Sequence, residues 1–195
     1  MLIWIILIIA FVYLDQITKY LAVIFLKTID TFPIIQDVIH FTYVENRGAA
    51  FGMLKNHRWV FMIVSVVGIV ALTWYLVKHR HEGNLQSLAL SMIVAGGIGN
   101  MIDRVVLGYV VDFIDFTLID FAVFNVADMF VCVGCGLEVL FLLKMLWDVY
   151  QETKAEQSAA KAESTDANKG EGTEASPSDM PAEKDKSEEP QNNAE

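Results

Sequence analysis

The stretch that decides the fold runs from Gly96 to Asp128 and joins two long apolar runs. It contains G-G-I-G-N-M-I-D-R at Gly96–Arg104, V-V-D-F-I-D at Val110–Asp115 and F-N-V-A-D at Phe124–Asp128. An ionised carboxylate in hydrocarbon costs several kcal/mol, so acids near membrane-length segments are expected away from lipid and in functional positions. This stretch nevertheless holds five aspartates, Asp103, Asp112, Asp115, Asp120 and Asp128.

The hydrophobic residues around this stretch are grouped rather than dispersed. They make up 54% of the 195 residues and form long runs, which is typical of an integral membrane protein. A helical crossing of the bilayer needs about 20 apolar residues, and a helix satisfies every backbone polar group in lipid. The sequence therefore predicts four transmembrane helices, at residues 2–26, 59–77, 84–106 and 126–147.

The charged residues of the short connections predict the orientation in the membrane. Lys78 and Arg80 lie between the second and third spans, and Lys144 lies near the end of the fourth. Cytoplasmic loops carry an excess of basic residues, so this side and both termini are expected in the cytoplasm. Residues 27–58 and 107–125 then face outward, and residues 38–44 have the β-branched and aromatic content of a strand.

The end of the chain has a different composition. Residues 151–195 carry twelve acids and five lysines, which gives −7 of the total charge of −10, and they include no aromatic residue. Such a segment buries too little apolar area to offset the entropy lost on ordering. We therefore predict two domains, a transmembrane domain at residues 1–150 and a disordered acidic cytoplasmic tail at residues 151–195.

Three further features can be interpreted structurally or chemically. Cys132 and Cys135 form C-x-x-C, but without other cysteines we expect buried, small packing residues rather than a redox or metal site. Asp15 and Lys19 share a helix face, which favours a structural ion pair over a chemical role. The glycines of E-N-R-G-A-A-F-G at Glu45–Gly52 suit either a tight loop or close approach of a substrate backbone.

The aspartates offer a specific chemistry if they lie together. An up-and-down bundle brings the end of the third span and the start of the fourth to one membrane face. Two neighbouring carboxylates cannot both ionise easily, so the pair shares a proton. The charged acid can then take a proton from water while the protonated one polarises a carbonyl, as in an aspartic protease. The alternative is a water-exposed acidic loop.

Spacing does not choose the pair. Asp103 is followed by Arg104, which favours a structural pair. In an extended segment Asp112 and Asp115 point to opposite faces, so at most one of them joins a given site. Asn125 lies one turn before Asp128, where it could orient a carboxylate or cap the helix.

Two other classes of function use the same features. Asp15 and Asp128 could relay protons or bind cations in a small transporter or channel subunit. Transporters bind near mid-span, however, and most acids here lie at span ends. A non-catalytic membrane scaffold would instead depend on the tail after Tyr150.

Five motifs together resemble lipoprotein signal peptidase (signal peptidase II), a family of bacterial membrane aspartic proteases. They are D-Q-I-T-K at Asp15–Lys19, N-R-G-A-A-F-G at Asn46–Gly52, G-G-I-G-N-M-I-D-R at Gly96–Arg104, V-V-D-F at Val110–Phe113 and F-N-V-A-D at Phe124–Asp128. The resemblance covers nearly all of residues 1–147. It implies an all-α membrane protein with four transmembrane helices and a small extracytoplasmic β element. It also implies the bacterial inner membrane, with the active site at the extracytoplasmic face.

The resemblance implies an activity and its residues. Such an enzyme removes signal peptides from prolipoproteins, cleaving just before the diacylglyceryl-modified cysteine, and is the target of globomycin. It needs no metal or cofactor, and we expect a monomer that contacts membrane lipid and binds no nucleic acid. By motif position the catalytic dyad falls on Asp112 and Asp128. The positions that line or support the site are Asn46, Asn100, Arg104, Asn125, Asp15 and Asp103.

Two features depart from the family pattern. The residue after the second acid is usually small and hydroxylated, whereas here it is Met129, which could alter local hydrogen bonding. The long acidic tail is not part of the usual pattern, so the resemblance says nothing about it.

Overall fold

The computed structural model describes residues 2–48, 58–79, 84–119 and 121–170. The chain divides into two compact units, Met1–Trp147 and Asp148–Glu195.

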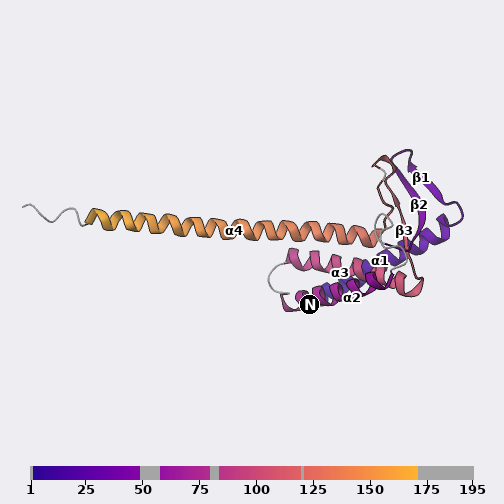
Figure 1. Cartoon of the computed structure of the whole chain (residues 1–195), viewed down its shortest axis with the longest axis horizontal. Helices are drawn as coiled ribbons and strands as arrows, with labels where there is room; N and C mark the ends of the chain where they lie inside the picture. Colours follow the sequence, from indigo (N-terminus) through magenta and orange to yellow (C-terminus); the bar gives the residue numbers. More distant parts are fainter. Residues whose placement is uncertain (1, 49–57, 80–83, 120, 171–195) are drawn as a thin grey trace, which may run out of the picture. The chain divides into compact units, whose positions relative to one another are not determined.

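Four α-helices carry most of the described chain (Figure 1). Helices α1 (Leu2–Leu26) and α3 (Asn84–Val106) have the predicted bounds, and α2 (Arg58–Lys78) extends its prediction by one residue at each end. Within the described ranges, α1, α3 and the first part of α4 are long and apolar enough to cross a membrane. The described side chains of α2 give a shorter apolar segment, Met62–Lys78.

Helix α4 (Val126–Gly170) differs from the prediction at its end. The predicted domain ended at residue 150 with a disordered tail, whereas residues 151–170 are helical. The physical reason lies in local propensity, because Ala155–Glu163 reads A-E-Q-S-A-A-K-A-E, which is rich in strong helix formers. No glycine or proline interrupts the sequence from residue 151 until Gly170. Residues 171–195 of the predicted tail lie outside the described residues.

The two predicted outward loops combine into one antiparallel sheet. It consists of β1 (Thr31–Ile35), β2 (Ile39–Asn46) and β3 (Val110–Asp115), in the order β1-β2-β3. The strand predicted at residues 38–44 corresponds to β2. Asp112 on β3 lies opposite Val44 on β2, with a register shift between Phe41 and Val44.

A small apolar core fixes this sheet to the end of α1. It consists of Ala22 and Leu26 from α1 with Val111 and Phe113 from β3. Phe41 of β2 packs against this core and meets the Phe113 ring edge-on at 6.0 Å between centroids. Because side chains alternate along a strand, burying Val111 and Phe113 directs Asp112 to the opposite face of β3.

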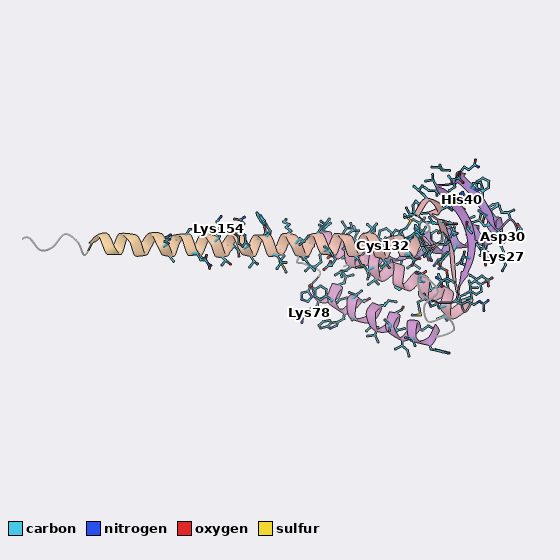
Figure 2. The ribbon with its side chains drawn as sticks, turned by 45° about the horizontal axis from the view of Figure 1, so that its top comes forward. Lys27, Asp30, His40, Lys78, Cys132 and Lys154 are labelled. Carbon is cyan, nitrogen blue, oxygen red and sulfur yellow. The ribbon has the colours of Figure 1, made fainter. Side chains whose placement is uncertain are left out.

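Glycines bring α3 and α4 into close contact. A Cβ at Gly134 would lie 2.7 Å from the Ala89 carbonyl oxygen, and a Cβ at Gly96 would overlap the Ala127 carbonyl. The prediction that Cys132 and Cys135 are buried packing residues was wrong, since both are exposed free thiols (Figure 2 labels Cys132). In an apolar run, hydrophobicity does not separate the packed face from the lipid-facing one, and the small residues that pack are the glycines.

Candidate active site

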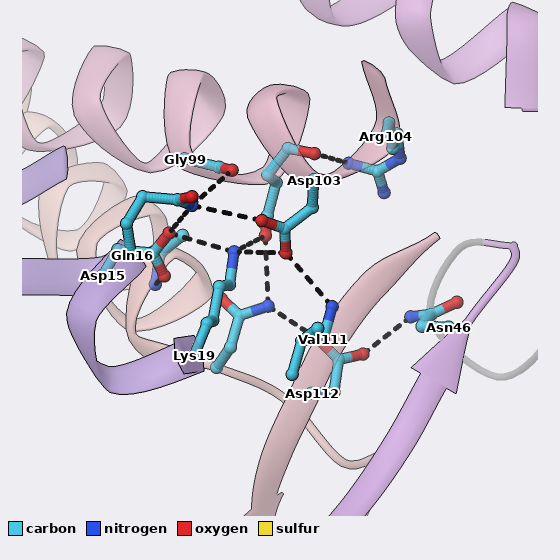
Figure 3. Close-up of polar contacts among 12 residues, drawn as sticks. Asp15, Gln16, Lys19, Asn46, Gly99, Asp103, Arg104, Val111 and Asp112 are labelled. Atoms are coloured by element: carbon cyan, nitrogen blue, oxygen red, sulfur yellow. Dashed lines mark hydrogen bonds and ion pairs between the residues drawn. The ribbon is translucent and has the colours of Figure 1, made fainter. Parts of the chain in front are cut away.

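A buried lysine organises the polar residues between α1 and α3. The Lys19 ammonium lies 3.0 Å from Asp15 Oδ2 and 3.1 Å from Asp103 Oδ2 (Figure 3). It also donates a hydrogen bond to Asn100 Oδ1 at 2.8 Å. Since Lys19 and both acids are nearly inaccessible to solvent, this ion-paired cluster compensates charges that would otherwise be very costly to bury.

Asp15 links α1 to the start of α4. Its Oδ1 accepts a hydrogen bond from the Ala127 backbone N–H at 2.9 Å, and Gln16 Nε2 donates to its Oδ2 at 3.1 Å. A Cβ at Gly99 would overlap the Asp15 carboxylate, so α1 approaches α3 this closely only because residue 99 is glycine. The expected pairing of Asp15 with Lys19 is confirmed. The pair also connects α1 to α4 through Ala127 and to α3 through Asp103.

Asp103 links α3 to α1 and to β3. Its Oδ2 accepts the Val111 backbone N–H at 3.1 Å, and its Oδ1 accepts a bond from Gln16 at 3.1 Å. The sequence suggested pairing with the adjacent Arg104, whereas the short ion pair of Asp103 is with Lys19. The carboxylate thus holds the strand that carries Asp112 next to the helices.

Asn125 and Asp128 form a reciprocal cap at the N-terminus of α4. Asn125 Oδ1 accepts the Asp128 backbone N–H at 3.0 Å, and Asp128 Oδ2 accepts the Asn125 backbone N–H at 3.2 Å. This is a capping box with aspartate as its acidic member. It fixes the Asp128 side chain at a helix N-terminus, where the helix dipole favours negative charge.

Two asparagines connect Asp128 to Asp112, and a third holds Asp112 from the other side. Asn100 Nδ2 donates to Asp128 Oδ1 at 2.7 Å. Asn125 Nδ2 donates to Asp112 Oδ1 at 2.6 Å and to Asn100 Oδ1 at 3.0 Å. Asn46 Nδ2 donates to Asp112 Oδ2 at 2.8 Å. Both suggested roles of Asn125 therefore occur together, because its oxygen caps α4 while its amide group orients a carboxylate.

The environment of Asp112 favours its protonated form. The residue is 2% exposed, and burial raises the pKa of its carboxyl to about 6. The hydrogen bond from Asn46 lowers this pKa, the charge of Asp128 raises it, and the bond from Asn125 lowers it. An acid whose pKa lies near neutrality can both hold and release a proton during catalysis.

Both acids line one cavity of about 970 Å³. Asn46, Asn100 and Arg104 also line it, and Arg104 Nη1 donates to the Asn100 carbonyl at 3.2 Å. Its apolar wall comes from the residues that precede α4 and from the first turns of that helix. This wall comprises Phe121, Ala122, Val123, Phe124, Met129, Cys132 and Val133.

The structure separates the candidate residues into two groups. Asp112, Asp128, Asn46, Asn100 and Arg104 line the cavity, and Asn125 is fully buried behind it. Asp15 and Asp103 lie in the buried cluster around Lys19. Asp115 is not among the residues that line the cavity, and it accepts a hydrogen bond from Thr42 at 2.9 Å. Extended geometry predicts that it lies on the opposite face of β3 from Asp112. Asp120 lies outside the described residues.

Sequence reasoning did not include Lys19 and Gln16 among the site residues. The four-residue spacing of Asp15 and Lys19 indicated their pairing, but nothing local indicated that Lys19 also contacts Asn100. Gln16 bridges Asp15, the Gly99 carbonyl and Asp103, and sequence gave no signal for these contacts.

Comparisons with known proteins agree on one family. The family model described as "Signal peptidase (SPase) II" matches residues 7–145. A lipoprotein signal peptidase of Caldanaerobacter subterraneus subsp. tengcongensis is 54% identical over 130 residues, covering 66% of this chain and 88% of that protein. The corresponding protein of Brevibacillus brevis is 46% identical over 127 residues, covering 65% and 85%.

Two solved structures of bacterial membrane enzymes have a similar fold. A bacterial membrane enzyme determined by the in meso method at 2.3 Å matches with a TM-score of 0.66 at 35% identity, covering 72% of this chain and 87% of that one. A second such structure, at 1.9 Å, matches with the same TM-score at 36% identity, covering 72% and 92%.

Proposed function

The chain belongs to the signal peptidase II family, and we propose that Asp112 and Asp128 are the catalytic pair of this aspartic endopeptidase. As a member of that family, the protein removes signal peptides from prolipoproteins. The observation that carries the assignment is that the two acids line the same cavity and are joined through the amide groups of Asn125 and Asn100.

The different surroundings of the two acids suggest their roles. Asp112 enters the reaction protonated and donates a hydrogen bond to the scissile carbonyl oxygen, in line with its raised pKa. Asp128 accepts a proton from water as the water oxygen bonds to the carbonyl carbon. The Asp112 proton passes to the developing oxyanion, giving a neutral tetrahedral intermediate. The C–N bond then breaks as Asp128 returns its proton to the leaving nitrogen and Asp112 takes back a proton from one hydroxyl group of the intermediate, which leaves the new carboxyl group and restores both acids.

The asparagines and the Lys19 cluster support this pair. Asn46 and Asn125 hold both oxygens of Asp112, and Asn100 holds one oxygen of Asp128. Lys19 and Asn125 both donate to Asn100 Oδ1, which leaves its amide group facing Asp128. Fixed donors of this kind stabilise charge without reorganisation during the reaction.

The membrane setting follows from the same assignment. We propose four transmembrane helices, with α2 as the second, and with both termini in the cytoplasm. The sheet and the cavity then lie at the extracytoplasmic face, where a lipid-modified cysteine presents the bond that precedes it. We further propose that the enzyme works as a monomer, that residues 1–150 contain the whole catalytic domain, and that residues 151–195 form a separate tail.

Single substitutions test the dyad, with Asp115 as a matched control. Asp112→Asn and Asp128→Asn should each reduce cleavage of a diacylglyceryl-modified prolipoprotein in vesicles to background, at normal abundance of the protein. Asp115 lies on the same strand as Asp112 but accepts a hydrogen bond from Thr42. The Asp115→Asn variant should therefore retain most of the cleavage activity. Full activity in either dyad variant would refute the assignment. Inhibition of the unmodified enzyme by globomycin would verify that the assay reports this activity.

A further inference from the structure

An exposed apolar tip projects from the connection between β3 and α4. Leu118 and Ile119 lie in the short 3₁₀ helix η2 (Thr117–Ile119) and are 69% and 68% exposed. Large apolar side chains gathered on a surface usually mark an interaction site. Neither residue takes part in the polar site described above.

The base of this tip is firmly held. After η2 the chain returns along β3, where the Phe124 N–H donates to the Ile114 carbonyl and the Ile114 N–H donates to the Phe124 carbonyl, at 3.0 and 2.8 Å. The rings of Phe116 and Phe124 stack at 5.6 Å between centroids, and Phe121 meets Phe124 edge-on at 5.9 Å. The exposed leucine and isoleucine are therefore carried on an ordered base.

Strand order places a second set of exposed apolar residues near this tip. His40 at the start of β2 pairs with Asp115 at the end of β3 and with Pro33 of β1. The end of β1 therefore lies at the same end of the sheet as η2. Ile34 and Ile35 are both about half exposed there. This end of the sheet thus presents an apolar patch formed by Ile34, Ile35, Leu118 and Ile119.

The residue that follows the apolar patch shares a cavity with exposed apolar side chains of α4. Phe121, two residues after the patch, is exposed and lines the cavity, as do Met129 and Val133 of α4. Those two α4 side chains are exposed on a helix that is long and apolar enough to span a membrane. Residues that leave a span and remain apolar are suited to the interface between headgroups and acyl chains.

We propose that this apolar patch inserts into the lipid surface on the side of the membrane that bears the cavity. The bilayer is the occupant because exposed Phe121, which follows the patch, lines the same cavity as exposed apolar side chains of a helix long and apolar enough to span a membrane. Insertion would hold β3, and with it Asp112, at a fixed depth. This last consequence rests on the proposed catalytic role of Asp112.

Depth measurement with a spin label tests the proposal without using activity. The full chain carries Ile119→Cys in a Cys132→Ala, Cys135→Ala background and is reconstituted in phosphatidylethanolamine–phosphatidylglycerol vesicles. Collision rates of the label with oxygen, which concentrates in lipid, and with a water-soluble nickel chelate are compared. Ile6→Cys on exposed apolar α1 and Lys154→Cys on the exposed polar part of α4 give the lipid and water references.

The proposal predicts an oxygen-to-nickel ratio for residue 119 several-fold above that of the Lys154 reference and toward that of Ile6. A ratio equal to that of Lys154 would overturn it. Low accessibility to both reagents, with dipolar broadening that disappears on dilution with unlabelled protein, would show a second copy on the patch and would also overturn it. The label at residue 119 is also measured in an Asp112→Asn variant, where the oxygen-to-nickel ratio should be unchanged. The test of insertion therefore does not depend on whether Asp112 is catalytic.

Discussion

The buried cluster around Lys19 and the cavity around Asp112 and Asp128 are built from the same acid, aspartate, in two different surroundings. Asp15 and Asp103 each meet the ammonium group of Lys19 within 3.1 Å. Asp112 and Asp128 are held by neutral amides and backbone N–H groups, and they line a cavity. Under the proposed assignment, the two acids paired with the Lys19 ammonium are structural, whereas the two held by amide groups on the cavity are available for proton transfer.

The largest expected loss of stability comes from removing the shared cation. Lys19→Met leaves the buried carboxylates of Asp15 and Asp103 without a positive charge beside them. The free energy of unfolding should therefore fall by about 3–5 kcal/mol. Lys27→Met is the matched control, because Lys27 pairs with Glu45 at 3.4 Å while half exposed, and it should cost about 1 kcal/mol or less. Denaturant titration in detergent micelles measures both. Equal losses in the two variants would remove the distinction between buried and exposed pairs.

The raised pKa of Asp112 predicts a pH dependence of stability. Its carboxyl has a pKa of about 6 in the folded protein against 3.8 in a model compound. The folded state therefore binds more protons between these values, so the contribution of Asp112 to stability falls as pH rises from about 4 to 6. The shift corresponds to about 3 kcal/mol.

Asp112→Asn isolates this contribution. The variant should be less sensitive to pH than the unmodified protein across pH 4–6, and relatively more stable above pH 6. Unfolding measured at several pH values in both proteins gives the difference directly. Parallel pH curves for the two proteins would contradict a raised pKa at Asp112.

A smaller effect should follow from adding one methyl group next to Asp15. Gly99→Ala forces the new Cβ into the Asp15 carboxylate, and overpacking of this kind typically costs about 1–3 kcal/mol. Gly68→Ala on α2 places its Cβ in open space and should be neutral or stabilising by up to about 1 kcal/mol. Thermal unfolding of both variants compares them. A neutral Gly99→Ala would show that α1 and α3 do not need their close approach.

The smallest effect is expected from the tail. Deleting residues 151–195 removes no residue of the Lys19 cluster or of the cavity, so cleavage of lipid-modified substrate should remain near normal. A scaffold that works through its tail would instead lose its function. The cleavage assay on the truncated protein, at matched abundance, distinguishes these outcomes.

Local sequence patterns predicted the features that depend on neighbouring residues. Apolar run length gave the bounds of α1 and α3, and four-residue spacing gave the pairing of Asp15 with Lys19. Strand alternation placed Asp112 and Asp115 on opposite faces. Contacts between distant segments were not accessible in this way, because they depend on how the helices and strands pack.

Three cases show what packing decides. Lys19 reaches Asp103 and Asn100 because Gly99 lets α1 approach α3. Asn46 reaches Asp112 because β2 pairs with β3 across a register shift. The cysteines of α4 are exposed rather than packed, since uniform apolarity carries no information about which helix face meets a neighbour.

The most direct test of the central comparison is turnover per folded molecule in Asp128→Asn and Asp103→Asn. Both variants are quantified by the fraction that resists denaturation, and both are assayed on the same lipid-modified prolipoprotein. We predict that Asp128→Asn folds normally and cleaves nothing, whereas Asp103→Asn is less stable but retains turnover in its folded fraction. A normally folded Asp103→Asn enzyme without turnover, beside an active Asp128→Asn enzyme, would contradict the division between structural and catalytic acids.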